Sequence, residues 1–162
     1  MTADIEAKAR KAIEACRARG WILATAESCT GGLVAGALTN VAGCSDVFDR
    51  GFVTYSNAAK QQMLGVPAAT LREHGAVSAE TAQAMAQGAL ARAKASLTVA
   101  ITGVAGPGGG TSAKPVGLVH FAVATRDGAL LRREKRFGDL GRAEVRRKSV
   151  DEALDLLLEA LD

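Results

Sequence analysis

The chain has 162 residues, which is close to the most common length of a single folded domain. Its composition is 48% hydrophobic and 23% charged, with 18 glycines; this is typical of a globular α/β protein and excludes a disordered chain, a collagen-like repeat and a coiled coil. The net charge is only +3 and aromatic residues make up 4% of the chain, which argues against surfaces that bind polyanions or stack bases. We therefore predict one domain over residues 1–162, with no nucleic-acid partner.

The cysteines and the apolar segments indicate the cellular setting. Cys16, Cys29 and Cys44 are odd in number and form no Cys-x-x-Cys pair, so we expect neither a zinc site nor a disulfide framework. Charged residues interrupt every apolar stretch before it reaches about 20 residues, the length of a membrane-spanning helix. The N-terminus lacks the apolar stretch of a signal peptide. We expect a cytoplasmic protein with no membrane partner.

In chain order, the first half alternates helical and extended patterns. Apolar residues at helical spacing predict a helix over residues 5–16 that stops at Gly20, and a short apolar run predicts a buried strand over residues 21–26. The further elements predicted in this half are a helix over 33–39, a loop over 40–46, a strand over 52–55 and a short helix over 57–64.

The second half adds two helices and three strands. Ser78 opens a long helix, and the Asp-Gly pair at residues 127–128 is a strong signal for a β-hairpin. The elements predicted here are a helix with its apolar face over 82–93, strands over 97–101, 116–125 and 129–137, and a last helix with its apolar face over 150–161. This alternation predicts a single three-layer α/β/α domain with a mixed sheet.

Three loops are placed at strand ends, where open α/β sheets collect ligands: residues 27–32, 43–46 and 102–110. Thr30, Gly31 and Gly32 stand at a helix start, where free N–H groups and the helix dipole favour an anion; an ordinary capped helix with glycines for tight packing is the alternative. Residues 103–110 are glycine-rich but match neither a Walker A loop nor a dinucleotide-binding fingerprint. They predict either a mobile turn or a ligand loop.

The residue types suited to catalysis are few. His74 and His120 each stand apart from other candidate ligands, and we interpret both as structural. Without a catalytic histidine, a lysine of lowered pKa can activate a serine, and Lys60 on a short helix is a candidate. Its partner is left open by the spacing: the candidates are Ser28, Ser45 and Ser56, with Cys44 as a rival nucleophile.

Several motifs together resemble a known family, the C-terminal domain of the competence/damage-inducible protein CinA and its stand-alone form, nicotinamide-nucleotide amidase. The blocks A-E-S-C-T-G-G and G-F-V-T-Y-S-N are the most specific. The matching stretches, which cover most of the chain in order and spacing, are residues 25–32, 50–60, 65–66, 74–78, 102–107 and 114–117.

The resemblance implies hydrolysis of nicotinamide mononucleotide to nicotinate mononucleotide and ammonia, with no cofactor and no metal. It implies that Ser45 is the nucleophile, that neutral Lys60 is its base, and that Thr102 belongs to the same catalytic site. The substrate-binding residues that it implies are Ser28, Thr30, Gly31, Gly32, Tyr55, Gly103 and Arg142. The phosphate is expected at the helix start of residues 30–32, with Arg142 or Arg146.

The partners expected from this resemblance are the small-molecule substrate and further copies of the chain in a homo-oligomer. Two alternatives belong to other classes of protein. A non-catalytic nucleotide-binding module would keep the glycine loops but would not need a serine together with Lys60. A nucleic-acid-binding domain carried by the basic residues 132–148 would require binding that depends steeply on salt.

Overall fold

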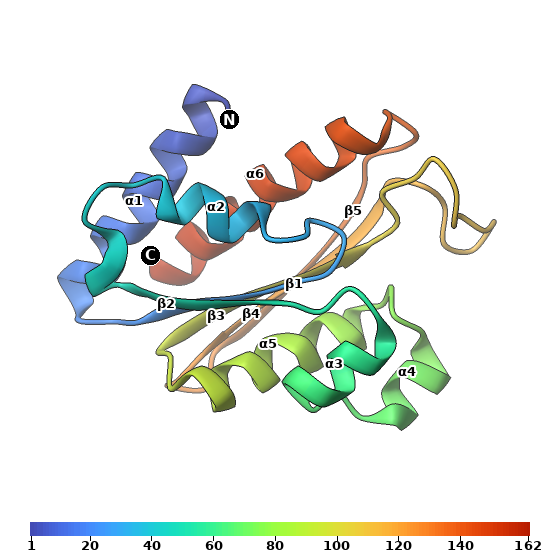
Figure 1. Cartoon of the computed structure of the whole chain (residues 1–162), viewed down its shortest axis with the longest axis horizontal. Helices are drawn as coiled ribbons and strands as arrows, with labels where there is room; N and C mark the ends of the chain where they lie inside the picture. Colours follow the sequence, from blue (N-terminus) through green and yellow to red (C-terminus); the bar gives the residue numbers. More distant parts are fainter.

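A five-stranded mixed sheet forms the centre of the structure (Figure 1). The computed structural model describes all residues from 1 to 162. The strands are β1 (Leu23–Glu27), β2 (Phe48–Val53), β3 (Leu97–Gly103), β4 (Leu118–Thr125) and β5 (Leu130–Arg136), in the order β2-β1-β3-β4-β5. β1 pairs in parallel with β2 and β3, whereas β4 is antiparallel to both β3 and β5. The mixed sheet is therefore confirmed.

Helices cover both faces of this sheet. Figure 1 shows α1 (Ala3–Arg19), α2 (Leu33–Thr39) and α6 (Arg142–Leu161) on one face, and α3 (Asn57–Leu64), α4 (Ala68–His74) and α5 (Ala79–Ala93) on the other. The short 3₁₀ helix η1 (Cys44–Asp46) precedes β2. The predicted three-layer α/β/α architecture is confirmed.

The two faces of the sheet are packed differently. Large aliphatic side chains such as Ile13, Leu38 and Leu154 fill the layer under α1, α2 and α6. The layer under α5 is instead rich in alanine, including Ala82, Ala86 and Ala89. Small side chains let a helix approach the sheet closely, so α5 forms a firm base for α3 and α4.

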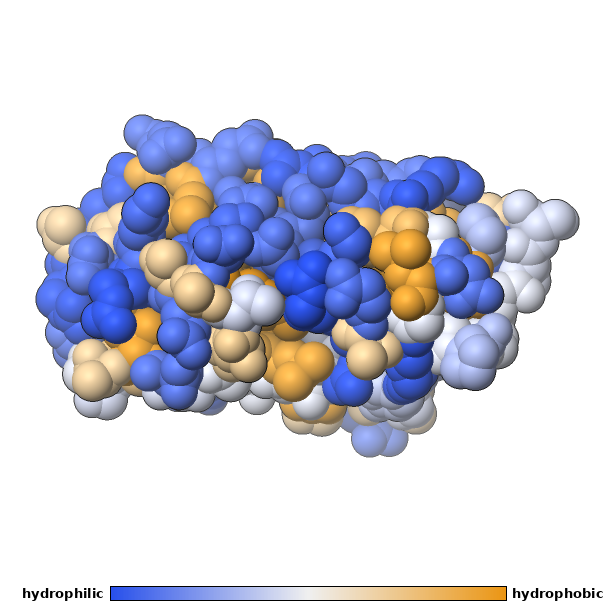
Figure 2. Space-filling view, turned by 90° about the horizontal axis from the view of Figure 1, so that it is seen from above, coloured by the Kyte–Doolittle hydropathy of each residue, from blue (hydrophilic) through white to orange (hydrophobic).

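The outer surface is mixed. Figure 2 shows the face that carries α1, α2 and α6 as mostly hydrophilic, with hydrophobic residues in separate spots. None of the helices combines the length and the hydropathy needed to cross a membrane.

Two predicted elements begin earlier than the sequence pattern indicated, and one helix was not predicted. β2 begins at Phe48 instead of at residue 52, because this edge strand is mostly exposed and carries charged residues that interrupt its apolar pattern. The helix α4 was not predicted; it is short, and its N-cap residue Pro67 forms no side-chain cap. The last helix begins at Arg142, about two turns before the apolar face that predicted it. The pattern did not mark this start because the first two turns are basic and largely half-buried.

Candidate functional site

A cleft of about 280 Å³ opens at the carboxyl ends of the parallel strands β1, β2 and β3. This is the edge at which open α/β sheets place their ligands. Side chains and backbone from both helical layers line it: Ser28, Cys29, Tyr55, Asn57, Lys60, Ala76, Val77, Thr102, Gly103, Val104, Ala105, Gly106, Gly108, Gly109 and Arg142.

Lys60 and Ser28 face each other in this cleft. The Nζ of Lys60 lies 3.0 Å from the Oγ of Ser28 and donates a hydrogen bond of 2.9 Å to the carbonyl oxygen of Thr54. The Lys60 side chain is only 1% exposed, and no carboxylate is paired with it. Burial lowers the pKa of Lys60, because the charged ammonium loses its hydration. A buried lysine beside a hydroxyl is the geometry of a general base and its nucleophile.

The local sequence explains why these two residues meet. Ser28 directly follows β1, and its N–H donates to the carbonyl of Ile101 at 2.9 Å, which ties it to β3. After the neighbouring strand β2, Ser56 caps α3 by accepting a hydrogen bond from the N–H of Ala59 at 3.0 Å. Lys60 is one turn further along α3. Because β1 and β2 are parallel, the segments that leave their carboxyl ends arrive at the same edge of the sheet.

The predicted pairing of Ser45 with Lys60 is wrong. Ser45 belongs to η1, which precedes β2, so it lies at the amino end of the strand that Lys60 follows. Leu23 pairs with Phe48 at that end and Glu27 pairs with Val53 at the other, which puts about 15 Å of strand between the two sites. Cys44, the predicted rival, shares this distant position.

The third candidate, Ser56, is also excluded as the partner of Lys60 by its geometry, because its hydroxyl serves as the N-cap of α3. The structure therefore selects Ser28 from the three serines. Ser28 directly follows a buried strand, and this position is the signal in the sequence that could have singled it out.

The predicted anion seat at the start of α2 is occupied by the protein itself. The carboxylate of Glu27 accepts hydrogen bonds from the N–H groups of Val34 at 2.9 Å and Ala35 at 3.0 Å. Gly31 and Gly32 have φ values of 57° and 100° and turn the chain toward α2. Neither these glycines nor Thr30 lines the cleft. The prediction that the substrate phosphate binds at this helix start is therefore corrected, because a buried carboxylate already occupies it.

Four other predicted residues do reach the cleft. Thr102 and Gly103 line it from the end of β3, and the hydroxyl of Thr102 donates to the carbonyl of Ala76 at 2.7 Å. Arg142 donates from Nη2 to the hydroxyl of Tyr55 at 2.6 Å and from Nη1 to the carbonyl of Gly106 at 3.0 Å. Arg142 thus links three separate segments around the cleft. Arg146, the other predicted arginine, does not line it.

The remaining nucleophiles and bases contribute little here. Burial raises the pKa of the Cys29 thiol to about 12, so this neighbour of Ser28 stays a thiol at neutral pH. His74 and His120 do not line the cleft. Asn57, Ala76 and Val77 do line it. They lie inside the matching stretches 50–60 and 74–78, but none of them was given a role in the site, because their side chains carry no acid, base or nucleophile.

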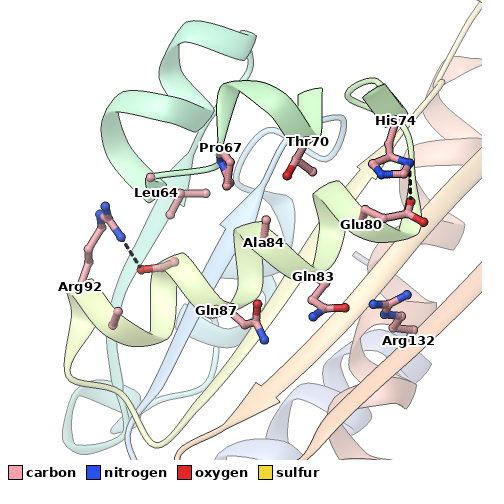
Figure 3. Close-up of a pocket in the computed structure, with 13 residues that line it drawn as sticks. Leu64, Pro67, Thr70, His74, Glu80, Gln83, Ala84, Gln87, Arg92 and Arg132 are labelled. Atoms are coloured by element: carbon pink, nitrogen blue, oxygen red, sulfur yellow. Dashed lines mark hydrogen bonds and ion pairs between the residues drawn. The ribbon is translucent and has the colours of Figure 1, made fainter. Parts of the chain in front are cut away.

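A larger groove of about 530 Å³ runs between α5 and the pair α3–α4 (Figure 3). It contains no lysine and no serine. It shows how α3 is seated: Gly88 of α5 lies under Leu64, the last residue of α3, and a Cβ at Gly88 would stand 2.0 Å from the Leu64 carbonyl oxygen. The pair of Lys60 and Ser28 lies in the smaller cleft, whereas the larger groove shows the contact between α3 and α5 that places Lys60.

Comparison with known proteins identifies the family. The profile described as CinA C-terminal domain matches residues 5–161. The nicotinamide-nucleotide amidohydrolase PncC of Escherichia coli strain K12 is 53% identical over 145 residues, which are 89% of this chain and 87% of that protein. The crystal structure of the competence/damage inducible protein CihA from Agrobacterium tumefaciens matches with a TM-score of 0.96 and 55% identity, covering 99% of this chain and 97% of that one. The chain belongs to the CinA C-terminal domain family.

Some relatives are much longer. The CinA-like protein of Synechococcus sp. strain RCC307 is 51% identical over 156 residues, which are 96% of this chain but 37% of that protein. The chain spans between about a quarter and about two fifths of the length of the first curated relatives that it matches.

Proposed function

We propose that the chain is an amidohydrolase that converts nicotinamide mononucleotide to nicotinate mononucleotide and ammonia through an acyl-enzyme on Ser28. The observation that carries the proposal is the 3.0 Å contact between the Oγ of Ser28 and the Nζ of the buried Lys60. It is supported by relatives named nicotinamide-nucleotide amidohydrolase in Escherichia coli and Enterobacter agglomerans.

In the first half of the proposed reaction, the neutral amine of Lys60 takes the proton of the Ser28 hydroxyl while Oγ attacks the carboxamide carbon. The tetrahedral intermediate then breaks its C–N bond, and Lys60 returns the proton to the departing ammonia. In the second half, Lys60 takes a proton from water, and the resulting hydroxide attacks the nicotinoyl ester. The ester C–O bond then breaks, Lys60 returns its proton to the Oγ of Ser28, and nicotinate mononucleotide leaves. The hydrogen bond to the Thr54 carbonyl holds Lys60 in place throughout.

The negative charge that develops on the carbonyl oxygen needs a donor. The N–H of Ser28 is already bound to Ile101, and the hydroxyl of Thr102 is bound to Ala76. The N–H of Cys29 has no oxygen acceptor in the protein and directly follows the nucleophile. We therefore assign this N–H to the oxyanion. Thr102 holds the segment of Ala76 and Val77 against the cleft.

The substrate phosphate is assigned to Arg142. This is the only arginine that lines the cleft, and Lys60 is neutral when active. The start of α2 is closed to an anion, because the carboxylate of Glu27 already fills it. Tyr55 at the mouth of the cleft is 58% exposed and holds the guanidinium of Arg142 through its hydroxyl, so we assign it to the same end of the substrate.

The test is release of ammonia from nicotinamide mononucleotide by the purified protein, with a chelator present. Ser28→Ala and Lys60→Met should each abolish it with the circular dichroism spectrum unchanged. Ser45→Ala and Ser56→Ala should retain it, since neither hydroxyl reaches Lys60. Full activity in Ser28→Ala would overturn the mechanism. A parent protein that binds the nucleotide but releases no ammonia would instead be a non-catalytic binding module.

A further inference from the structure

The turn that carries Ser28 depends on other parts of the protein for its shape. It spans residues 28–32 between β1 and α2 and contains two glycines in succession, Gly31 and Gly32, both with positive φ. Glycine has the widest conformational freedom of any residue, so such a turn is held by its contacts more than by its own backbone. Two charged side chains hold it: one bonds to the turn itself, and the other joins the two elements that the turn connects.

Arg146 holds the turn from α6. Its Nε donates to the carbonyl of Cys29 at 3.1 Å and its Nη2 donates to the carbonyl of Thr30 at 3.3 Å. A Cβ at Gly31 would stand 3.3 Å from Nη2, so the glycine leaves room for the guanidinium. The planar fork of arginine suits two neighbouring carbonyls, and a lysine would supply only a single point of contact.

Glu27 holds the turn from β1. Its side chain is fully buried, and both carboxylate oxygens are used, one on the N–H of Val34 and one on that of Ala35. The carboxylate therefore fixes the end of β1 to the start of α2, with a favourable interaction with the helix dipole. The backbone of Glu27 also accepts a hydrogen bond from the N–H of Thr54 at 2.8 Å.

Lys60 is placed independently of this turn. It is fixed by α3 and by the Thr54 carbonyl, so the distance between its Nζ and the Ser28 Oγ is set from the serine side by the turn. Neither Glu27 nor Arg146 lines the cleft, so neither touches a bound substrate. Proton transfer between Ser28 and Lys60 requires a heavy-atom separation of about 2.6–3.2 Å, and a displacement of about 1 Å can cost on the order of 100-fold in rate.

We propose that Glu27 and Arg146 are positioning residues that clamp the turn of residues 28–32 and set the Ser28 hydroxyl against Lys60. The clamp rests on the proposed function, because it assumes that Ser28 is the nucleophile. It acts on the reacting geometry, so its loss lowers kcat and leaves KM nearly unchanged.

The kinetic experiment compares Arg146→Ala, Arg146→Lys and Glu27→Gln with the parent protein. We expect kcat for nicotinamide mononucleotide to fall about 100-fold in Arg146→Ala, with KM changed less than about threefold, and Arg146→Lys to recover part of the loss. Arg147→Ala is the matched control. Arg147 is the next residue on α6 and pairs only with Glu144 at 2.7 Å, so its removal should leave kcat unchanged. A rise in KM at constant kcat in Arg146→Ala would overturn the clamp.

Two readouts separate the clamp from the identity of the substrate. Hydrogen–deuterium exchange of the amides of residues 28–35 should rise in Arg146→Ala and Glu27→Gln but not in Arg147→Ala. Acylation of Ser28 by p-nitrophenyl acetate, followed by mass spectrometry, should slow in the same two variants. If the parent releases no ammonia while these two effects are seen, the substrate is wrong and the clamp stands. Unchanged exchange in Arg146→Ala overturns the clamp, whatever the activity of that variant. If Glu27→Gln does not fold, the result for Arg146→Ala alone is used.

Discussion

Lys60 occupies an unfavourable place for a cation. Its side chain is 1% exposed and has a hydroxyl and a carbonyl as partners but no carboxylate. Removing an ammonium from water favours the neutral amine, which is why burial lowers the pKa of Lys60. A methionine would fill the same space without the free-energy cost of burying an amine. The burial of Lys60 beside Ser28 therefore points to proton transfer.

The pH dependence of activity follows from this titration. We expect kcat/KM to rise with pH through the lowered pKa of Lys60 and then to level off, because only the neutral amine accepts the Ser28 proton. Lys60→Arg stays protonated at every accessible pH, so its activity should be lower by about 10²–10⁴-fold and should not recover at high pH. The measurement is a pH–rate profile of both proteins. A parent profile that is flat from pH 5 to 10 would contradict the role of Lys60.

The same titration affects folding. Between the lowered pKa of Lys60 and its ordinary value of 10.5, the unfolded chain binds more protons than the folded one, so the contribution of Lys60 to the free energy of unfolding rises with pH in this window. Below the window the full burial cost of the ammonium is present, and above it the cost is absent. Urea unfolding of the parent and of Lys60→Met should therefore show a difference in free energy that moves in favour of the parent as pH rises. A difference independent of pH would show that the pKa is not lowered.

At the scale of elements, the contact between α3 and α5 sets the position of Lys60 in the cleft. α3 carries Lys60 and ends on Leu64, whose backbone carbonyl lies directly over Gly88 of α5. Figure 3 shows Leu64 and Arg92 beside this part of α5, with Arg92 bonded to the Gly88 carbonyl. The contact is between backbones, so it cannot adapt by turning a side chain. The position of Lys60 therefore depends on a glycine that is not itself in the cleft.

Two glycine substitutions test this dependence. Gly88→Ala places a Cβ 2.0 Å from the Leu64 carbonyl oxygen, and we expect it to lower the free energy of unfolding by about 1–3 kcal/mol and to lower kcat by displacing Lys60. Gly36→Ala, on the exposed side of α2, meets nothing within 4 Å and should raise stability by about 0.5–1 kcal/mol at full activity. Urea unfolding and initial rates measure both. Parental stability in Gly88→Ala would refute the tight contact.

The sequence was informative wherever burial imposes a pattern. The helix α5 and the strand β3 have the apolar spacing expected of buried elements, and the Asp-Gly turn at residues 127–128 joins β4 to β5 as predicted. β2 was misplaced because an edge strand needs no continuous apolar run. Ser28, Tyr55, Lys60, Thr102, Gly103 and Arg142 were predicted for the site and line the cleft, but the serine that contacts Lys60 was not singled out. Which end of the sheet a loop reaches depends on strand direction and register, and this separates Ser28 from Ser45.

At the scale of the whole molecule, the cleft is assembled from both helical layers. The turn after β1 and the end of β3 with the loop that follows it line the cleft, α3 supplies Lys60 from one layer, and α6 supplies Arg142 from the other. Figure 1 shows these elements far apart along the chain but meeting at one edge of the sheet. A ligand in the cleft therefore contacts segments that separate only on unfolding, so binding is expected to stabilise the entire domain.

This coupling allows the phosphate contact of Arg142 to be measured without turnover. In Ser28→Ala, nicotinamide mononucleotide at about 100 times its Kd should raise the free energy of unfolding by about 2.7 kcal/mol, a shift of several degrees in Tm. The double variant Ser28→Ala/Arg142→Ala should lose most of this shift at the same concentration, because the cleft then has no arginine to bind the phosphate. Nicotinamide, which has no phosphate, should give a small shift that does not depend on Arg142. If the nucleotide gives the same shift in Tm with and without Arg142, the phosphate binds elsewhere. If the shifts given by the nucleotide and by nicotinamide fall equally when Arg142 is removed, Arg142 acts by joining Tyr55 to Gly106 and so shapes the cleft itself.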